Sequence, residues 1–154
     1  MPDKKAARDK WIKLGFLGAI LVALLVVYLL QSRDIEVKGW GTDLPAALAK
    51  AKTEDRDVLI LFVNAPPSAT ARKIQQKIIP KPANTKAVTN GNFVPVTVSL
   101  DGGLEADLAK QYKLKALPTL MILGSDGTER RRHEGNIGEV PFRQAFLEGG
   151  QGQQ

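Results

Sequence analysis

The feature that most constrains this chain is the segment DVLILFVN, residues 57–64, in which six apolar residues follow one another without interruption. A strand with one solvent-exposed face alternates apolar and polar residues, whereas a strand that is buried on both faces consists of a continuous apolar run. The segment therefore predicts a central strand. A central strand needs other elements to cover both faces of its sheet, so we expect helices on each side.

Segments with helical and strand-like patterns alternate around this strand. The patterns predict helices over 44–55, 68–79, 103–114 and 140–149, a strand over 93–100, and a hairpin over 117–135. Thr42 or Asp43 is placed to cap the first of these helices. Residues 80–92, PKPANTKAVTNGN, are rich in Pro, Asn and Gly and predict a loop. This order predicts an α/β sandwich with a mixed central sheet.

A second apolar run, residues 14–30, contains no charged residue at all. Together with residues 11–13 it reaches the ~20 residues that cross a hydrocarbon core. We expect an uncleaved transmembrane anchor over 14–31, with Trp11, Lys13 and Tyr28 at the membrane interfaces. The alternative is a cleaved signal peptide, but the run ends in YLLQSRD, which lacks the small residues of a cleavage site.

The charge of the first 13 residues predicts how the anchor is oriented. They hold five Lys or Arg and two Asp, so their net charge is 5 − 2 = +3 out of +6 for the chain. A basic flank stays in the cytoplasm, which places the C-terminal part on the outer side, in the periplasm of a Gram-negative cell. We therefore expect a basic head over 1–13, the anchor over 14–31, a tether over 32–41, a folded domain over 42–149 and a flexible tail over 150–154. The lipid bilayer is the first expected partner.

The absence of cysteine limits the chemistry of this chain. With no cysteine and a single histidine, His133, the sequence has no disulfide, no thiol nucleophile, no zinc–thiolate site and no histidine-rich metal site. It also contains no Ser-His-Asp set, no glycine-rich phosphate loop and no metal-ligand spacing. We predict that it binds no metal and no cofactor.

Three local strings resemble the thioredoxin-like superfamily. The string FVNAPPSATARKI resembles that family's active-site turn, approximately F-x-A-x-W-C-x-x-C-K, with Pro67 at the tryptophan, Ser68 at the first cysteine and Ala71 at the second. The string ALPTLMILGSDG resembles the family's cis-proline strand, with Leu117 before the proline, Pro118. A third string, GWGTDLPAALAKAKTEDRDVLILF, resembles the entry helix and first central strand of the small, membrane-anchored bacterial members of the family. The resemblance covers about residues 40–149. It implies a thioredoxin-like α/β/α sandwich.

The resemblance also implies a peptide groove. In the family an extended peptide pairs with backbone beside the cis-proline, and this pairing needs no sulfur. The expected groove residues here are Pro67, Ser68, Ala69, Leu117 and Pro118. A serine and an alanine cannot exchange disulfides, so redox chemistry is excluded. In the simpler reading, the groove is vestigial and Ser68 only caps the helix.

The segment ERRRHE, residues 129–134, is the other candidate site. Charged residues often protect an edge strand from pairing with another chain, and this is the first interpretation of the segment. The alternative is that the segment binds an anionic partner or a lipid headgroup. Nucleic acid is not expected, because no aromatic platform accompanies the arginines. We predict a non-catalytic domain that docks a protein or peptide on the outer side of the cytoplasmic membrane. The alternative is an accessory or scaffold subunit of an envelope thiol-redox or assembly complex. An enzyme that uses Ser68 is disfavoured because no base accompanies that residue.

Overall fold

The computed structural model describes the backbone of residues 4–31 and 35–149, with the side chains of 15–29 and 35–149. The chain divides into two compact units, residues 1–33 and 34–154. Residues 1–3 of the predicted head (1–13), residues 32–34 of the predicted tether (32–41) and the predicted tail (150–154) lie outside the described residues.

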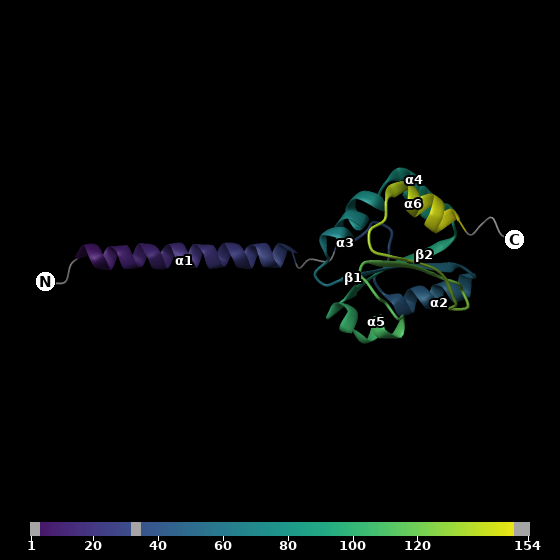
Figure 1. Ribbon diagram of the computed structural model, residues 1–154, viewed down its shortest axis with the longest axis horizontal. Helices are drawn as coiled ribbons and strands as arrows, with labels where there is room; N and C mark the ends of the chain where they lie inside the picture. Colours follow the sequence, from purple (N-terminus) through teal and green to yellow (C-terminus); the bar gives the residue numbers. More distant parts are fainter. Residues whose placement is uncertain (1–3, 32–34, 150–154) are drawn as a thin grey trace. The chain divides into compact units, whose positions relative to one another are not determined.

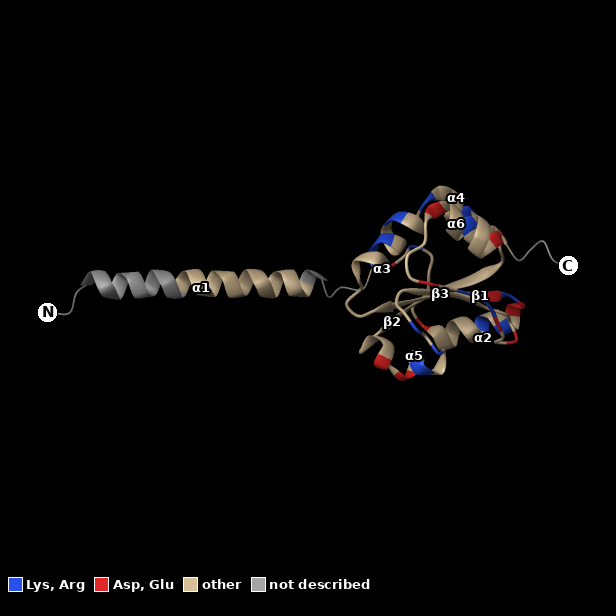
Figure 2. Ribbon diagram, in the orientation of Figure 1, with Lys and Arg blue, Asp and Glu red and all other residues tan. Residues whose placement is uncertain are grey.

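The first unit consists of helix α1 (Lys4–Gln31). Its large side chains from Phe16 to Leu29 are exposed, Tyr28 among them, and its described side chains carry no charge (Figure 2). The side chains of Trp11 and Lys13 lie outside the described part. Among the helices of the described residues, none is both long enough and apolar enough to cross a membrane. The predicted anchor is therefore not shown, and it stays a prediction.

The second unit is built on a mixed four-stranded sheet with the strand order β2-β1-β3-β4. β1 (Asp57–Asn64) pairs in parallel with β2 (Phe93–Leu100) and antiparallel with β3 (Thr119–Leu123), which pairs antiparallel with β4 (Glu129–Glu134). Helices lie on both faces of the sheet, α2 and α5 on one and α3, α4 and α6 on the other (Figure 1). The prediction of an α/β fold with a mixed sheet and β1 at its centre is confirmed.

β1 contributes side chains to two separate cores, because successive side chains of a strand point to opposite faces of the sheet. Leu59, Leu61 and Val63 belong to the core under α3, α4 and α6. Val58, Ile60 and Phe62 belong to the core over α2 and α5. All six are 0% exposed. The unbroken apolar run thus reflects burial on both faces.

Helix α2 begins where its capping residue predicts. Asp43 caps α2 (Leu44–Glu54) by accepting a hydrogen bond from the amide of Ala46 at 2.9 Å. α3 (Ala69–Lys73) continues into the π-helical turn η1 (Ile74–Ile78), and the 3₁₀ turn η2 (Gly103–Glu105) precedes the short helix α5 (Asp107–Gln111). α6 (Glu139–Pro141) continues into a second π-helical segment, η3 (Phe142–Glu148).

The predicted loop at 80–92 is instead largely a helix, α4 (Pro82–Asn90). Pro82 stands in the first turn, where a missing N–H costs nothing, so it starts the helix rather than breaking it. Asn84 is fully buried, and its amide donates to the carbonyl of Ile78 at 2.8 Å. Val88 enters the core of this face. The prediction was wrong because these stabilising contacts are made with other parts of the chain.

The predicted tether also differs from the structure over 35–41, because these residues pack on the domain. Val37 is buried in the core, and Trp40 packs against it. Gly41 donates to the carbonyl of Pro95 and accepts from the amide of Thr97, at 3.0 and 2.9 Å. The alternation of Ile35 and Val37 followed by Trp40 was the sequence signal for this packing.

Candidate functional site

The turn between β1 and α3 is closed by its own backbone and by one arginine. The Ala65–Pro66 peptide bond is cis, and the amide of Ala65 donates to the carbonyl of Leu100 at the end of β2, at 3.1 Å. Pro67 is buried, and its carbonyl accepts from Nε of Arg72 at 3.1 Å. The turn is therefore fixed between the ends of two strands and the helix that follows.

The two positions that correspond to the family's cysteines have structural roles here. Ser68 is the N-cap of α3, and its hydroxyl oxygen accepts from the amide of Ala71 at 3.2 Å. Ala71 is 0% exposed and belongs to the core. Ser68 thus stabilises the first turn of the helix, as the simpler reading proposes. Ala69, between them, is exposed.

The Leu117–Pro118 peptide bond is cis, as the resemblance implies. The peptide units around it are held in place. The carbonyl of Ala116 accepts from the hydroxyl of Thr119 at 2.7 Å, and that of Pro118 accepts from the amide of Gly135 at 2.8 Å. Pro118 is buried and Leu117 is half-buried.

The sheet register brings the turn and Pro118 to one edge. The last pair between β1 and β3 joins Phe62 to Thr119. Because the strands are antiparallel, the start of β3 lies beside the end of β1. Pro118, which immediately precedes β3, therefore lies at the same end of the sheet as the turn. Among the hydrogen bonds of the described residues, none uses the backbone N–H or C=O of Leu117. The edge therefore presents a free peptide unit beside a turn with no sulfur.

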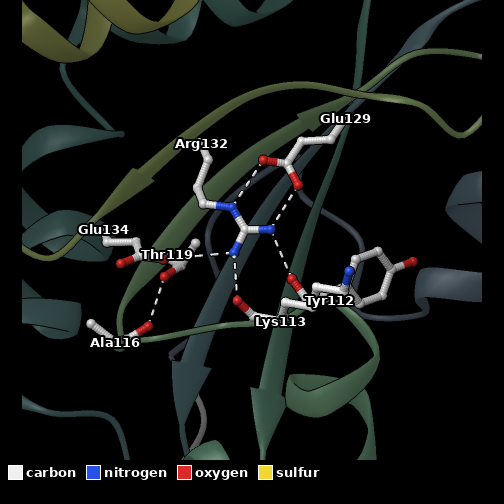
Figure 3. A network of polar contacts seen from close by, with 7 residues as sticks. All are labelled: Tyr112, Lys113, Ala116, Thr119, Glu129, Arg132 and Glu134. Atoms are coloured by element: carbon white, nitrogen blue, oxygen red, sulfur yellow. Dashed lines mark hydrogen bonds and ion pairs between the residues drawn. The ribbon is translucent and has the colours of Figure 1, made fainter.

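The arginine segment forms β4, and its side chains are held by the domain itself. Arg132 donates to both carboxylate oxygens of Glu129, at 2.9 and 2.6 Å, and to the carbonyls of Tyr112 and Lys113, at 2.7 and 3.0 Å (Figure 3). The hydrogen bond from Arg132 lowers the pKa of the Glu129 carboxyl, and burial raises the pKa of the Tyr112 hydroxyl. Glu134 lies 3.6 Å from the guanidinium of Arg132.

The other two arginines are also engaged within the domain. Arg131, on the opposite face of the sheet, donates to the carbonyls of Phe146 and Leu147 at the end of η3. Arg130 lies 3.5 Å from Asp57. A ring nitrogen of His133 lies 3.0 Å from the carbonyl of Asn136. These contacts favour a structural role for β4 over a free anion-binding surface.

A cavity that the sequence did not predict lies at the other end of β2 from the turn. It has a volume of about 850 Å³ and is bounded by residues 35–40, by η1, by α4 and by the start of β2. Gln75, which lines it, is 2% exposed, and its side-chain carbonyl oxygen has no hydrogen-bond partner among the described residues. Among these residues, no group of three or more His, Asp or Glu is placed to hold a metal ion.

Comparison with known proteins identifies relatives of the second unit. The sequence model of the thioredoxin-like domain matches residues 44–149. Comparison with the curated proteins gives no match. The solution structure of a thioredoxin from Thermus thermophilus is 22% identical, with a TM-score of 0.58 over 75% of this chain and 92% of that one.

Two other solved structures are similar to the same part of the chain. The C-terminal domain of DsbD from Neisseria meningitidis, in its oxidised form, is 20% identical, with a TM-score of 0.56 over 71% of this chain and 97% of that one. A DsbH oxidoreductase is 17% identical, with a TM-score of 0.54 over 77% of this chain and 88% of that one. At these identities the likeness establishes the fold alone.

Proposed function

This chain belongs to the thioredoxin-like domain family, and we propose that its domain docks an extended segment of a partner protein without any thiol chemistry. The absence of cysteine removes disulfide exchange from this domain. At the two positions of the family's cysteines stand a capping hydroxyl and a buried methyl group. Both stabilise the fold, Ser68 as the cap of α3 and Ala71 within the core.

The observation that carries the proposal is the free peptide unit of Leu117. Its N–H and C=O are used by no hydrogen bond among the described residues. An extended segment adds to a fold by pairing its backbone with such free groups, and nearby side chains then select its sequence. Pro67, Ser68, Ala69 and Pro118 flank this unit in the proposal, with the exposed Ala69 at the rim.

We further propose that α1 anchors the domain to the cytoplasmic membrane, with residues 1–13 inside and the domain outside. The support is the uncharged run 14–30, the basic residues before it, and the exposure of the large apolar side chains from Phe16 to Leu29. An apolar surface of this kind in water is unfavourable unless lipid or a partner covers it. The test is extraction of membranes with alkaline carbonate, in which an anchored chain stays in the pellet.

The second candidate function is an accessory or scaffold subunit of an envelope complex whose activity lies in a partner. In this candidate the complex is a thiol-redox or assembly complex; the C-terminal domain of DsbD and a DsbH oxidoreductase share the fold of this domain. The identity of the captured partner separates this candidate from a general docking role.

Site-specific photo-crosslinking in native membranes tests the docking proposal. A photoreactive residue replaces Ala69 at the rim of the groove, and in the control it replaces Gln144 on η3, which is also exposed. We expect one dominant protein product from position 69 that is absent from position 144. No specific product at position 69, or the same products at both positions, contradicts the proposal.

A blocking variant shows whether the capture depends on the groove. Leu117→Glu in the protein with the probe at Ala69 places a charge next to the peptide unit that would pair; because Leu117 packs against the core over α2 and α5, circular dichroism checks that the variant folds. We expect this variant to lose the product while the control variant Val140→Glu, at an exposed apolar position on α6, keeps it. Equal yields from both variants would argue against pairing at Leu117.

A further inference from the structure

We propose that the cavity beside residues 35–40 is a binding site for a small anionic amphiphile, a molecule with an apolar body, one N–H or O–H donor and one anionic group. The cavity is separate from the edge at Pro118, because it lies at the start of β2 and the turn lies beyond its end. The proposal therefore does not depend on the docking function. We call this volume the β2 cavity.

The size and the walls of the β2 cavity suit a small molecule. Its volume of about 850 Å³ falls within the range of roughly 300–1,000 Å³ that is typical of ligand pockets. Much of the wall is apolar, and its larger apolar members are Ile35, Val37, Trp40, Ile79, Val88 and Phe93. Such a wall favours an aliphatic or aromatic body.

The side chain of Gln75 favours a ligand that carries a hydrogen-bond donor. Its side chain is 98% buried, and its amide nitrogen donates to the carbonyl of Ile35 at 3.1 Å, which fixes the orientation of the amide. The amide oxygen has no partner among the described residues. A buried acceptor that lacks a donor destabilises the folded protein. The oxygen has less than 1 Å² of accessible surface, so in this proposal the Gln75 side chain turns toward the cavity to accept from a ligand N–H or O–H.

The charged residues of the wall favour an anion. Lys38, Lys50 and Arg56 carry positive charge, and Glu36 is the one acidic residue that lines the cavity. Arg56 already pairs with Glu54 at 2.7 Å and donates to the carbonyl of Phe93. Lys38 and Lys50 have no ion pair among the described residues. These two ammonium groups are therefore free to meet a carboxylate.

The edge of β2 disfavours a peptide strand as the occupant. Pro95 has no N–H to offer, and its carbonyl already accepts from Gly41. The carbonyl of Phe93 accepts from Arg56. Strand addition needs free backbone groups along an edge, and these groups are occupied. The cavity thus suits a compact molecule, which needs only one donor to match Gln75.

The test uses the full chain in lipid nanodiscs and three related ligands. N-octanoylglycine has an apolar chain, an amide N–H and a carboxylate. N-octanoylsarcosine lacks the N–H, and the methyl ester of N-octanoylglycine lacks the charge. Trp40 lines the cavity and reports binding through its fluorescence, with Trp11→Phe removing the other tryptophan of the chain. Empty nanodiscs give the background.

We expect saturable binding of N-octanoylglycine and about tenfold weaker binding of each of the other two ligands, which corresponds to one lost polar contact per ligand. In Gln75→Met the glycine and sarcosine derivatives should bind equally, because the acceptor that distinguishes them is gone. In a variant with both Lys38→Gln and Lys50→Gln, the acid and its ester should bind equally. Absence of saturable binding, or equal binding of all three ligands to the unmodified cavity, overturns the proposal.

A matched pair of threonines controls for the location of the site. Thr89 lines the cavity, and Thr53 on α2 does not; both are exposed, and each hydroxyl donates to the carbonyl four residues earlier, at 3.0 and 2.9 Å. Thr89→Phe should weaken binding at least tenfold because the ring enters the cavity, whereas Thr53→Phe should leave it unchanged. An equal effect of both variants would place the ligand elsewhere and overturn the assignment.

Discussion

Replacement of Arg132 by methionine should destabilise the domain by about 2.5 kcal/mol, because this side chain joins β4 to the segment that follows α5. The hydrogen bond to the carbonyl of Tyr112, in a partly buried position, contributes about 1.5 kcal/mol. The more exposed bond to Lys113 and the ion pair with Glu129 add about 0.5 kcal/mol each, after allowance for solvent screening. Methionine keeps much of the apolar stem, so the loss reports the polar contacts.

Arg130→Met is the control, because Arg130 lies on the same strand, at its bulge, and takes no part in the contacts of Arg132. Its side chain is 52% exposed, and its ion pair with Asp57 measures 3.5 Å. A pair of this kind contributes at most about 0.5 kcal/mol. The free energy of unfolding is measured by urea titration of the full chain in detergent, with Trp40 as the probe in a Trp11→Phe background.

Arg132→Lys separates the shape of the guanidinium from its charge. A single ammonium cannot serve the carboxylate of Glu129 and the two carbonyls at once, so this variant should lose most of the same stability. If Arg132→Met costs no more than Arg130→Met, or if Arg132→Lys is as stable as the unmodified protein, the argument that the network of Figure 3 holds β4 is refuted.

Three further predictions follow from single contacts. Ser68→Ala should cost about 1 kcal/mol of stability by removing the cap of α3, while partner capture at position 69 persists; loss of capture in a folded variant would instead assign the hydroxyl a role in binding. Asn84→Ala should cost about 1–3 kcal/mol, because the carbonyl of Ile78 loses a buried donor, and hydrogen exchange of residues 82–90 should accelerate; an unchanged exchange pattern would contradict the anchoring of α4 by Asn84. The hydrogen bond from Arg132 lowers the pKa of Glu129 in the folded state, so its contribution is present above the ordinary carboxyl pKa of about 4.3 and is lost as the pH falls through the lowered value. The stability difference between the unmodified protein and Glu129→Gln should therefore be full near pH 7 and shrink below about pH 4; a difference that grows on acidification would reverse the sign of this argument.

Much of the domain was determined by short segments of sequence, because their signals are local. The unbroken apolar run of β1 requires burial on both faces, whatever the covering elements are. The side chain of Asp43 reaches an amide three residues away, so its capping role needs no tertiary contact. The loss of thiol chemistry also follows from composition alone, since neither Ser68 nor Ala71 can form a disulfide.

Tertiary structure decided the elements whose partners lie far along the chain. Residues 82–90 resemble a loop by composition, yet Val88 packs in the core and Asn84 satisfies a carbonyl of the preceding helical segment. Residues 35–41 resemble a tether, yet Gly41 pairs with β2, and residues 35–40 line the β2 cavity. Weak local preference in such segments is outweighed by burial and long-range hydrogen bonds, which single-sequence patterns do not contain. The free peptide unit of Leu117 and the unpaired oxygen of Gln75 belong to this second class, because only the assembled fold determines which polar groups have partners.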